Sequence, residues 1–347
     1  MEKKYYDGTK ILSMKDINGK TPEIYIVTTN RTGGKTTYFN RLLVNRFLKQ
    51  DKKFGLLYRY TYEIDDAADK FFKDIQNLFF PDYTMTSKIG GNGFFRRLYL
   101  NDQECGYAIA INSSDQVKKH SHLYSDIDSL LFDEFQSESG DYCPKEIMKF
   151  QSVHTSIARG QNKQVRYVPV YMLSNPVSLL NPYYVAFGIS HRLQKDTKFI
   201  RGNGWVMEQG YIPSAADAQM KSAFNQAFMN GNDNYLEYSA QGIYLNDNVT
   251  FIDKPKGKFR YVANIKYENK YYSVKEYYEQ GIVYIDTSVD MQFNVNISAT
   301  LDDHTVNHIM MHRGAPIIAM LKNYFDRGCI RFRNIACKEC LFALITY

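Results

Sequence analysis

The sequence lacks the segments that place a protein in a membrane or outside the cell. No apolar run approaches the roughly 20 residues that a membrane-spanning helix needs. The segment from Met1 to Lys10 is polar and lacks the apolar core of a secretory signal peptide. We therefore expect a protein that works in the cytoplasm and has no membrane partner.

Cysteine is scarce, and its count is odd. Five thiols suit a reduced, intracellular protein better than a disulfide framework. Cys337 and Cys340 form a lone CxxC, and without a second such pair a structural zinc site is disfavoured. His304, His308 and His312 recur every four residues, which would align them on one face of a helix. A polar helix face is favoured over a metal site there.

The composition is compatible with a sizeable core and with a nucleic-acid partner. With 347 residues, 44% of them hydrophobic and 23% charged, the chain is long enough for about two domains. Its net charge of +6 permits nucleic-acid binding without demanding it, because a basic face makes the binding surface. Contacts to DNA phosphates and an ordinary solvated surface are equal alternatives for Arg96, Arg97, Lys254, Lys256, Lys258 and Arg260.

Strands alternate with helices over the first 205 residues. The pattern predicts a hairpin from 94–100 and 105–111, and further strands over 23–29, 54–60, 128–132 and 165–173. It predicts helices over 35–49, 62–79 and 145–159. This alternation favours an α/β fold with a mostly parallel sheet, which we assign to a domain of residues 1–205.

The pattern changes after residue 205. A helix is predicted over 213–229, within a segment, 206–247, that we interpret as a linker or lid subdomain. A second, smaller domain is predicted over 248–347, with strands over 259–267, 270–274 and 281–287 and a helical part over about 302–326.

The strand over 23–29 runs directly into a Gly-Gly-Lys-Thr loop, and a helix follows. A motif of the class GxxxxGK[ST] in this context binds phosphate, because backbone N–H groups at the helix N-terminus hold phosphate oxygens. Lys35 would reach the β- and γ-phosphates of ATP, and Thr36 would place its hydroxyl on Mg²⁺. The residues assigned to nucleotide binding are Arg31, Thr32, Gly33, Gly34, Lys35, Thr36 and Thr37.

Thr29 replaces the first glycine of this motif. A β-branched residue disfavours a positive φ, so the loop must turn elsewhere, and Gly33 and Gly34 can supply that freedom. A Gly-Gly turn before a helix also occurs for structural reasons alone, so the motif needs a second signal.

That second signal is an apolar strand ending in two acids, Asp133 and Glu134. We assign the ordering of Mg²⁺ to Asp133 and the polarisation of the attacking water to Glu134, which would act as general base. The alternative without function is a pair of carboxylates at an exposed strand tip. The two motifs together, each in the context that it requires, favour an ATPase.

Three further polar residues are candidates for the same site. Asn175 follows the strand over 165–173, where the ligand crevice of an open α/β sheet lies, although a plain turn residue is an equal alternative. Arg159, near a helix end, could reach into a neighbouring subunit, or it could simply interact with the helix dipole. Lys119 precedes the acidic strand and could also act across an interface or be solvated.

At these residues the chain resembles the genome-packaging ATPases of small tailed phages, the φ29-type family. The resemblance rests on the loop NRTGGKT, the strand LLFDEF and the segment MLSNPVSLLNPYY, with GIVYIDT nearer the end. It extends over nearly the whole chain, with an insertion before the strand over 165–173.

The resemblance implies an ASCE-type P-loop ATPase domain, a small linker domain and a C-terminal α+β domain of the RNase H type. It implies a homopentameric ring, with or without a scaffold RNA. Such a ring uses ATP and Mg²⁺ to pump double-stranded DNA through a portal into a prohead in the host cytoplasm. By position, Arg159 matches the trans-acting finger, Lys119 the second trans-acting basic residue and Asn175 the coupling residue. Arg31 matches an arginine inside the family's loop.

The C-terminal domain carries too few strand acids for a nuclease that uses two metals. The strand over 259–267 has no carboxylate before Glu268, and Asp286 stands alone at its strand end. We expect a nuclease fold that has lost catalysis. The alternatives are a terminase with a working nuclease, another P-loop helicase or translocase, and a DNA-binding protein with a decayed nucleotide site, which Thr29 favours.

Overall fold

The computed structural model describes residues 5–138, 140–160, 162–178, 181–189, 192, 197–228, 252–312, 314–326 and 329–346. Their contacts divide into two compact units. The first contains 5–137, 145–160, 162–177 and 197–228, and the second contains the remaining described residues. The predicted boundaries at 205 and 247 stay predictions.

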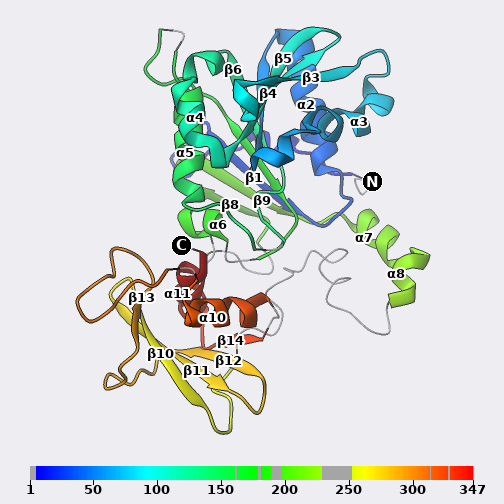
Figure 1. The fold of residues 1–347 in the computed structure, drawn as a ribbon. Coiled ribbons are helices and arrows are strands. Elements are labelled where there is room, and N and C mark those ends of the chain that lie inside the picture. Colours follow the sequence, from blue (N-terminus) through cyan, green and yellow to red (C-terminus); the bar gives the residue numbers. More distant parts are fainter. Residues whose placement is uncertain are drawn as a thin grey trace. The chain divides into compact units, whose positions relative to one another are not determined.

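A mostly parallel sheet forms the centre of the first unit (Figure 1). Its strand order is β3-β4-β5-β2-β6-β7-β1-β9-β8, and the strands from β5 through β9 in that order are parallel. The strands are β1 (Ile24–Thr29), β2 (Lys53–Tyr58), β3 (Met85–Gly90), β4 (Phe95–Leu100), β5 (Gln103–Ala110), β6 (Ile127–Phe132), β7 (Val170–Ser174), β8 (Phe199–Gly202) and β9 (Trp205–Gly210).

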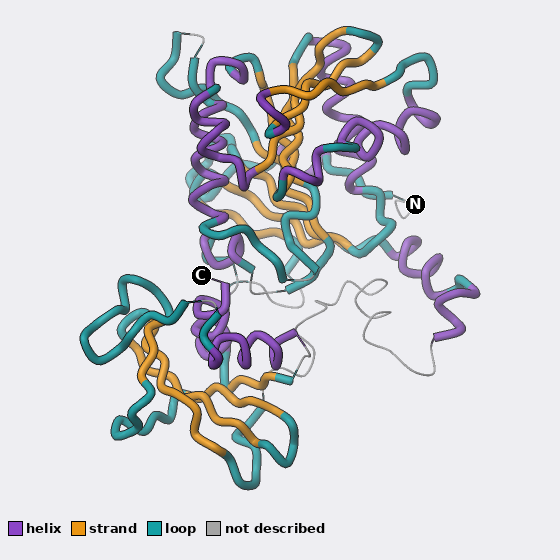
Figure 2. The backbone as a smooth tube through the Cα atoms, in the orientation of Figure 1, coloured by secondary structure: helices purple, strands orange, loops and turns teal. Residues whose placement is uncertain are grey.

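Helices cover both faces of this sheet, which is why its central strands are almost continuously apolar. Figures 1 and 2 show α2 and α3 on one side and α4 and α5 on the other. The helices of this unit are α1 (Thr9–Ser13), α2 (Lys35–Gln50), α3 (Ala67–Phe79), α4 (Ser114–Lys119), α5 (Glu146–Ile157), α7 (Pro213–Met220) and α8 (Ala223–Phe228). Single 3₁₀ turns are η1 (Thr61–Ile64), η2 (Gly91–Gly93), η3 (Ile111–Ser113) and η4 (Ser121–Tyr124).

Strand β7 lies between β1 and β6. The strand that enters the phosphate loop and the strand that ends in two acids are therefore separated by one additional strand, as expected for the ASCE class. All three are parallel, so their carboxyl ends meet at one edge of the sheet. The α/β class predicted for this part of the chain is confirmed.

Several predicted elements differ in extent. The predicted strand over 165–173 pairs only from Val170, because Arg166 is buried and donates to the backbone carbonyls of Ile127 and Ile157. The predicted helix over 62–79 is divided into η1 and α3. The predicted helix over 213–229 breaks between α7 and α8, and residue 229 lies outside the described residues.

The structure adds β3, β8 and β9 to the predicted strands. β8 and β9 are joined by the two residues Asn203 and Gly204, and Gly204 has a positive φ of 76°. An Asn-Gly pair between two strands is a strong hairpin signal, so the sequence did carry this information. β9 then pairs in parallel with β1, with Thr29 opposite Gly210.

The second unit contains a five-stranded sheet in the order β13-β10-β11-β12-β14. β10, β11 and β12 are antiparallel, and β13 and β14 run parallel to β10 and β12 at the two edges. In the expected RNase H-like arrangement, the first strand of an antiparallel meander pairs in parallel with a fourth strand, as β10 does with β13. The fifth strand, β14, lies at the opposite edge, beside β12. The elements are β10 (Arg260–Tyr267), β11 (Lys270–Tyr277), β12 (Ile282–Asp286), β13 (Asn296–Ser298), β14 (Ile330–Phe332), α6 (Pro182–Ala186), α10 (Pro316–Asp326) and α11 (Ile335–Thr346).

Helices α10 and α11 cover the apolar face of this sheet. Cys337 and Cys340 lie in that core, packed with side chains such as Ile265 and Ile285. Burial raises the pKa of the Cys337 thiol to about 11 and that of Cys340 well above its usual value. Both thiols therefore pack as small apolar groups.

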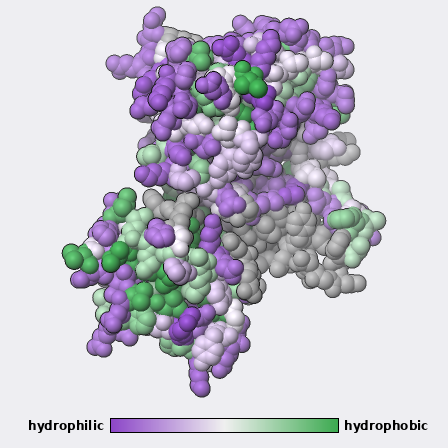
Figure 3. All heavy atoms as spheres, viewed as in Figure 1, coloured by the Kyte–Doolittle hydropathy of each residue, from purple (hydrophilic) through white to green (hydrophobic). Residues whose placement is uncertain are grey.

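The prediction that His304, His308 and His312 share a helix face is wrong. Only Pro316–Asp326 of the predicted 302–326 region is helical; the three histidines lie in turns and isolated bridges before it. Their ring nitrogens serve local bonds, such as His312 Nδ1 accepting from Gly314 N–H at 3.0 Å. The four-residue spacing predicted a helix wrongly, because each histidine lies in a separate local turn or bridge and not in one continuous helix. Figure 3 shows apolar residues at the surface of this unit, where Met291, Leu301, Val306 and Ile309 are exposed.

Candidate active site at the carboxyl edge of the parallel sheet

The phosphate loop joins β1 to the N-terminus of α2. Gly34, the N-cap residue of α2, has a positive φ of 88°, and Thr32 also takes a left-handed conformation with φ of 59°. Thr29 is not among the residues with positive φ, so the missing first glycine costs the loop no strain there. The expectation that Gly34 supplies the turn is confirmed.

Gly33 serves the loop differently from the prediction. It has no left-handed backbone, but a Cβ on it would lie 2.9 Å from Ile212 Cγ1 and 3.3 Å from the Asn30 carbonyl oxygen. Real Cβ atoms do not tolerate the first of these distances, so close packing rather than a positive φ requires glycine here.

Lys35 and Asn175 meet across the sheet edge. Lys35, the first residue of α2, is 7% exposed, and its Nζ donates to Asn175 Oδ1 at 2.7 Å. Asn175 directly follows β7, so the additional strand brings this amide to the loop lysine.

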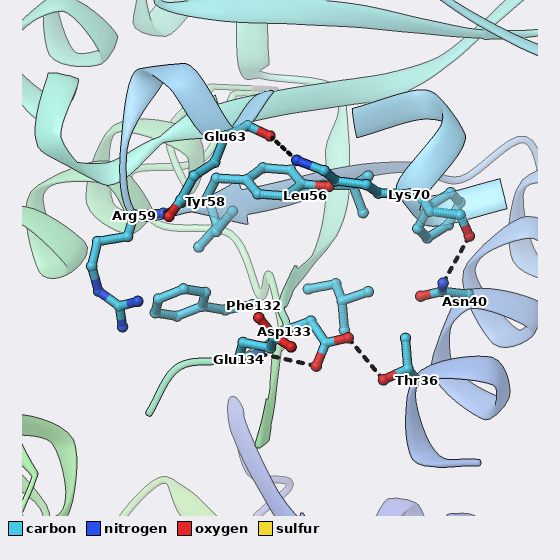
Figure 4. A pocket seen from close by; sticks show the side chains of 13 residues that line it. Thr36, Asn40, Leu56, Tyr58, Arg59, Glu63, Lys70, Phe132, Asp133 and Glu134 are labelled. Carbon is cyan, nitrogen blue, oxygen red and sulfur yellow. Dashed lines mark hydrogen bonds between the residues drawn. The ribbon is translucent and has the colours of Figure 1, made fainter. Parts of the chain in front are cut away.

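Thr36 and the acidic pair meet at the same edge (Figure 4). Thr36 Oγ1 donates to Asp133 Oδ2 at 2.8 Å, and the Glu134 N–H donates to Asp133 Oδ1 at 2.9 Å. Desolvation raises the pKa of Asp133, opposed by the charge of Lys35 and by these two hydrogen bonds. The loop and the acids, 97 residues apart, thus form one site.

Glu134 is exposed and has a left-handed backbone, with φ of 55°. Such a conformation costs a non-glycine residue about 1–3 kcal/mol and persists where neighbours hold it. The next residue supplies one restraint, because the Phe135 N–H donates to the Leu173 carbonyl of β7 at 3.1 Å. The turn therefore directs the Glu134 side chain away from the apolar core.

A cavity of about 430 Å³ adjoins the acidic pair. Its lining combines apolar strand residues with polar groups. In Figure 4, Thr36 points to Asp133, whereas Lys70 donates to the Glu63 carbonyl on the other side of the cavity. The residues are Thr36, Asn40, Leu56, Leu57, Tyr58, Arg59, Glu63, Lys70, Phe71, Leu131, Phe132, Asp133 and Glu134.

Arg59 is a site residue that sequence reasoning missed. It follows β2, is 7% exposed, and pairs through Nε with Glu146 Oε2 at 3.0 Å. Its Nη2 donates to the Phe135 carbonyl at 2.7 Å, so it holds the backbone just after the acidic pair. No local pattern marks such a residue, because its partners lie 76 and 87 residues further along the chain.

The remaining predicted loop residues are Arg31, Thr32 and Thr37. Arg31 is half-buried, and Thr32 Oγ1 donates to its carbonyl at 2.7 Å. Thr37 lies in the first turn of α2.

Arg159 and Lys119 are not brought to the loop. Arg159 lies two residues beyond the end of α5 rather than in its last turn, and Lys119 is the final residue of α4. Both are exposed, and in the described part of the chain their charged ends contact neither the loop nor the acids.

Asp286 in the second unit is wholly buried and paired with cations. Lys275 Nζ lies 2.9 Å from Asp286 Oδ2, and Arg333 Nη1 lies 3.2 Å from Oδ1. Burial alone would raise the pKa of Asp286, but the hydrogen bonds and charges of Lys275 and Arg333 outweigh it and lower the pKa. Both carboxylate oxygens of Asp286 are therefore paired with cationic side chains.

Lys275→Met is expected to lower the free energy of unfolding of the second unit by about 3 kcal/mol at pH 7, because it leaves a buried carboxylate short of a partner. Since the folded pKa of Asp286 is lowered, its stabilisation is present above about pH 4 and is lost as the pH falls through that lowered pKa. The difference from the parent should therefore shrink in acid. Urea titrations followed by circular dichroism measure it.

The first unit provides an internal reference for this experiment. Trp205, the single tryptophan, lies on β9, so its fluorescence follows the first unit alone. Lys258→Met, an exposed lysine of the second unit, is the matched control. Equal unfolding free energies for Lys275→Met and Lys258→Met at pH 7 would contradict the assigned role of the ion pair.

Within the described residues, no helix combines the length and apolarity needed to cross a bilayer. The same residues contain no cluster of three or more His, Cys, Asp or Glu side chains suited to a metal ion. A magnesium site at Thr36 and Asp133 would thus depend on phosphate oxygens and water for its other ligands.

Known proteins resemble this chain over nearly its full length. The DNA packaging protein of Bacillus phage phi29 is 25% identical over 347 residues, covering 98% of this chain and 96% of that protein. The fold is similar to that in the bacteriophage Phi-29 viral genome packaging motor assembly, with a TM-score of 0.55, 23% identity and coverage of 96% and 95%. It is also similar to that of the Phi-28 gp11 DNA packaging motor, with a TM-score of 0.59, 15% identity and 98% coverage of both chains.

The family model for the podovirus DNA encapsidation protein (Gp16) matches residues 1–346. The φ29-type resemblance noted in the sequence is thereby confirmed. Because this match spans the chain and the fold agrees with it, the protein belongs to the podovirus DNA encapsidation protein (Gp16) family.

Proposed function

We propose that this DNA packaging protein hydrolyses ATP and uses the energy to move double-stranded DNA into a prohead. One observation carries the proposal: two side-chain hydrogen bonds, Thr36 to Asp133 and Lys35 to Asn175, join the phosphate loop to the ends of β6 and β7. The three sequence motifs thus converge on one place, as nucleotide chemistry requires.

The residues divide the work of the site. The loop N–H groups and Lys35 would bind the phosphates, while Thr36 and Asp133 offer the oxygen ligands that Mg²⁺ prefers. When bound, ATP supplies the phosphoanhydride and Mg²⁺ offsets its charge. Glu134, exposed on its strained turn, would take a proton from the attacking water.

Asn175 is suited to report nucleotide binding. Its carbonyl oxygen accepts from Lys35 Nζ, the group that phosphate oxygens would also attract. A charged acceptor forms the stronger bond, so Lys35 would turn to the phosphates and release Asn175. This exchange would pass the binding event to β7 and the segment that follows it.

Arg159 and Lys119 would act on a neighbouring subunit. Their exposure and their lack of contact with this chain's own loop support action in trans within a homo-oligomeric ring, which we propose to be a pentamer. The ring would work on the portal of a prohead, with or without a scaffold RNA. We further propose that residues 1–205 form the ATPase domain, 206–247 the linker or lid, and 248–347 the RNase H-like domain.

The purified chain is expected to hydrolyse ATP faster when double-stranded DNA is added. Lys35→Ala should lower this turnover at least about 10²-fold, because the charge that stabilises the transferred phosphoryl group is lost. A phosphate-release assay, with sedimentation velocity at the same protein concentration, measures turnover and oligomeric state together.

Lys49→Ala is the matched control, since Lys49 is exposed near the other end of the same helix α2. Turnover by Lys35→Ala equal to that of Lys49→Ala would exclude the loop as the catalytic site. Nicking of a supercoiled plasmid with Mn²⁺ or Mg²⁺, abolished by Asp286→Ala, would favour a terminase with a working nuclease instead.

A further inference from the structure

The side chain of Asn30, in the phosphate loop, makes a pair of hydrogen bonds to a single distant residue. Asn30 Nδ2 donates to the Ile212 carbonyl at 3.1 Å, and the Ile212 N–H donates to Asn30 Oδ1 at 2.9 Å. Asn30 is 0% exposed and Ile212 is 9% exposed. The amide therefore pairs with the backbone as a neighbouring strand would, away from solvent.

Ile212 is also where α7 begins. It is the N-cap residue of α7, and its carbonyl accepts from the N–H groups of Ala215 and Ala216 at 3.2 Å each. Asn30 thus donates to the carbonyl that starts the helix. The Ile212 side chain lies against Gly33, where a Cβ would come within 2.9 Å of Cγ1.

A third loop residue reaches the same helix. Gln219 Nε2, in the last turn of α7, lies 3.4 Å from Thr32 Oγ1. The loop therefore contacts both ends of α7, through Thr32 at one end and through Asn30 and Gly33 at the other. A change in loop shape must either move α7 or break the buried Asn30 pair.

We propose that Asn30 is a positioning residue that couples nucleotide binding at the phosphate loop to helix α7. Through its two bonds, it fixes the entry of the loop, where Thr29 stands in place of a glycine. It also transmits a change in the loop to α7, and through α7 to α8, the helix that follows it. This inference rests on the proposed nucleotide site, but it concerns a residue to which that site assigns no contact with the nucleotide.

Amide hydrogen exchange over 213–220, with and without Mg²⁺-ADP, tests this role. In the parent chain ADP should slow the exchange of these amides, because an occupied loop holds Ile212 in place. In Asn30→Ala the response should be lost, while the Kd for ADP should rise about tenfold, as for the loss of the buried pair. The intensity and wavelength of Trp205 fluorescence, on β9, report whether the unit is folded.

Two further variants separate coupling from mere stability. Asn30→Asp keeps the shape and the acceptor for the Ile212 N–H but loses the donor, so its ADP response over 213–220 should be weakened even if Asn30→Ala does not fold. Asn18→Ala, which removes a bond to Asn203 in an exposed turn of the same unit, should respond like the parent.

The outcomes distinguish the two proposals. If the parent does not bind ADP, the nucleotide site itself is wrong. If the parent binds ADP but 213–220 does not respond, or if both Asn30 variants respond as the parent does, the coupling role of Asn30 is overturned. Uniformly faster exchange across β1 and β9 in the variants, with the ADP response intact, would also overturn it in favour of a purely structural role.

Discussion

Glu134→Gln is expected to reduce ATP turnover by about 10²–10⁴-fold while leaving nucleotide affinity nearly unchanged. The amide keeps the size of the side chain but cannot take a proton from water. Binding should survive, because the bonds from Lys35 to Asn175 and from Thr36 to Asp133 do not involve the Glu134 carboxylate. Single-turnover hydrolysis and the Kd of a fluorescent ATP analogue measure the two effects separately.

Asp128→Asn provides the matched control for this prediction. Asp128 lies near the start of β6, the strand that ends beside Glu134, and is half-buried. It should hydrolyse ATP like the parent. Equal turnover in Glu134→Gln and Asp128→Asn would remove Glu134 from the chemistry and leave Asp133 as the remaining candidate.

Arg159→Ala is expected to lower turnover by about 10³–10⁵-fold if Arg159 stabilises the transition state of a neighbouring subunit. Alone, this loss would not show action in trans. Mixing Arg159→Ala subunits with Glu134→Gln subunits tests action in trans. An Arg159→Ala subunit keeps its own Glu134, and a neighbouring Glu134→Gln subunit can supply the missing Arg159. In a random equal mixture, about a quarter of the interfaces should then be complete.

The mixture must exceed either variant alone under conditions where the protein is oligomeric. Turnover no higher than that of the separate variants would count against action in trans. Lys163→Ala, an exposed cation four residues beyond Arg159, should retain the parent rate and shows that loss of charge in this turn is harmless.

The sequence is most informative where chemistry needs a contiguous segment. Lys35 and Thr36 begin a helix that follows an apolar strand, and Asp133 and Glu134 directly follow another apolar strand. Both patterns can be recognised in the sequence without the fold. Asn203 and Gly204 also carry the signal for the hairpin of β8 and β9. The hairpin was not predicted, because apolar and polar residues do not alternate clearly in the short strands on either side of this pair.

What could not be predicted depends on partners far apart in the chain. Arg59 resembles any cation after a strand until the fold places Glu146 beside it. Asn30 resembles any polar loop residue until β9 brings Ile212 alongside. The spacing of His304, His308 and His312, in contrast, indicated a structure that is not there. A repeat of four places residues on one face only in a helix, and the local turns do not form one.

The bond between Lys35 and Asn175 has a consequence for the reaction cycle. After hydrolysis, departing products would leave an ammonium group in a place with little access to water, which is costly unless a partner is at hand. Asn175 provides that partner, and because its amide is neutral it holds the lysine without opposing the arrival of the next triphosphate. Among the partners of Lys35, the Asn175 amide is therefore one that an arriving triphosphate displaces at little electrostatic cost.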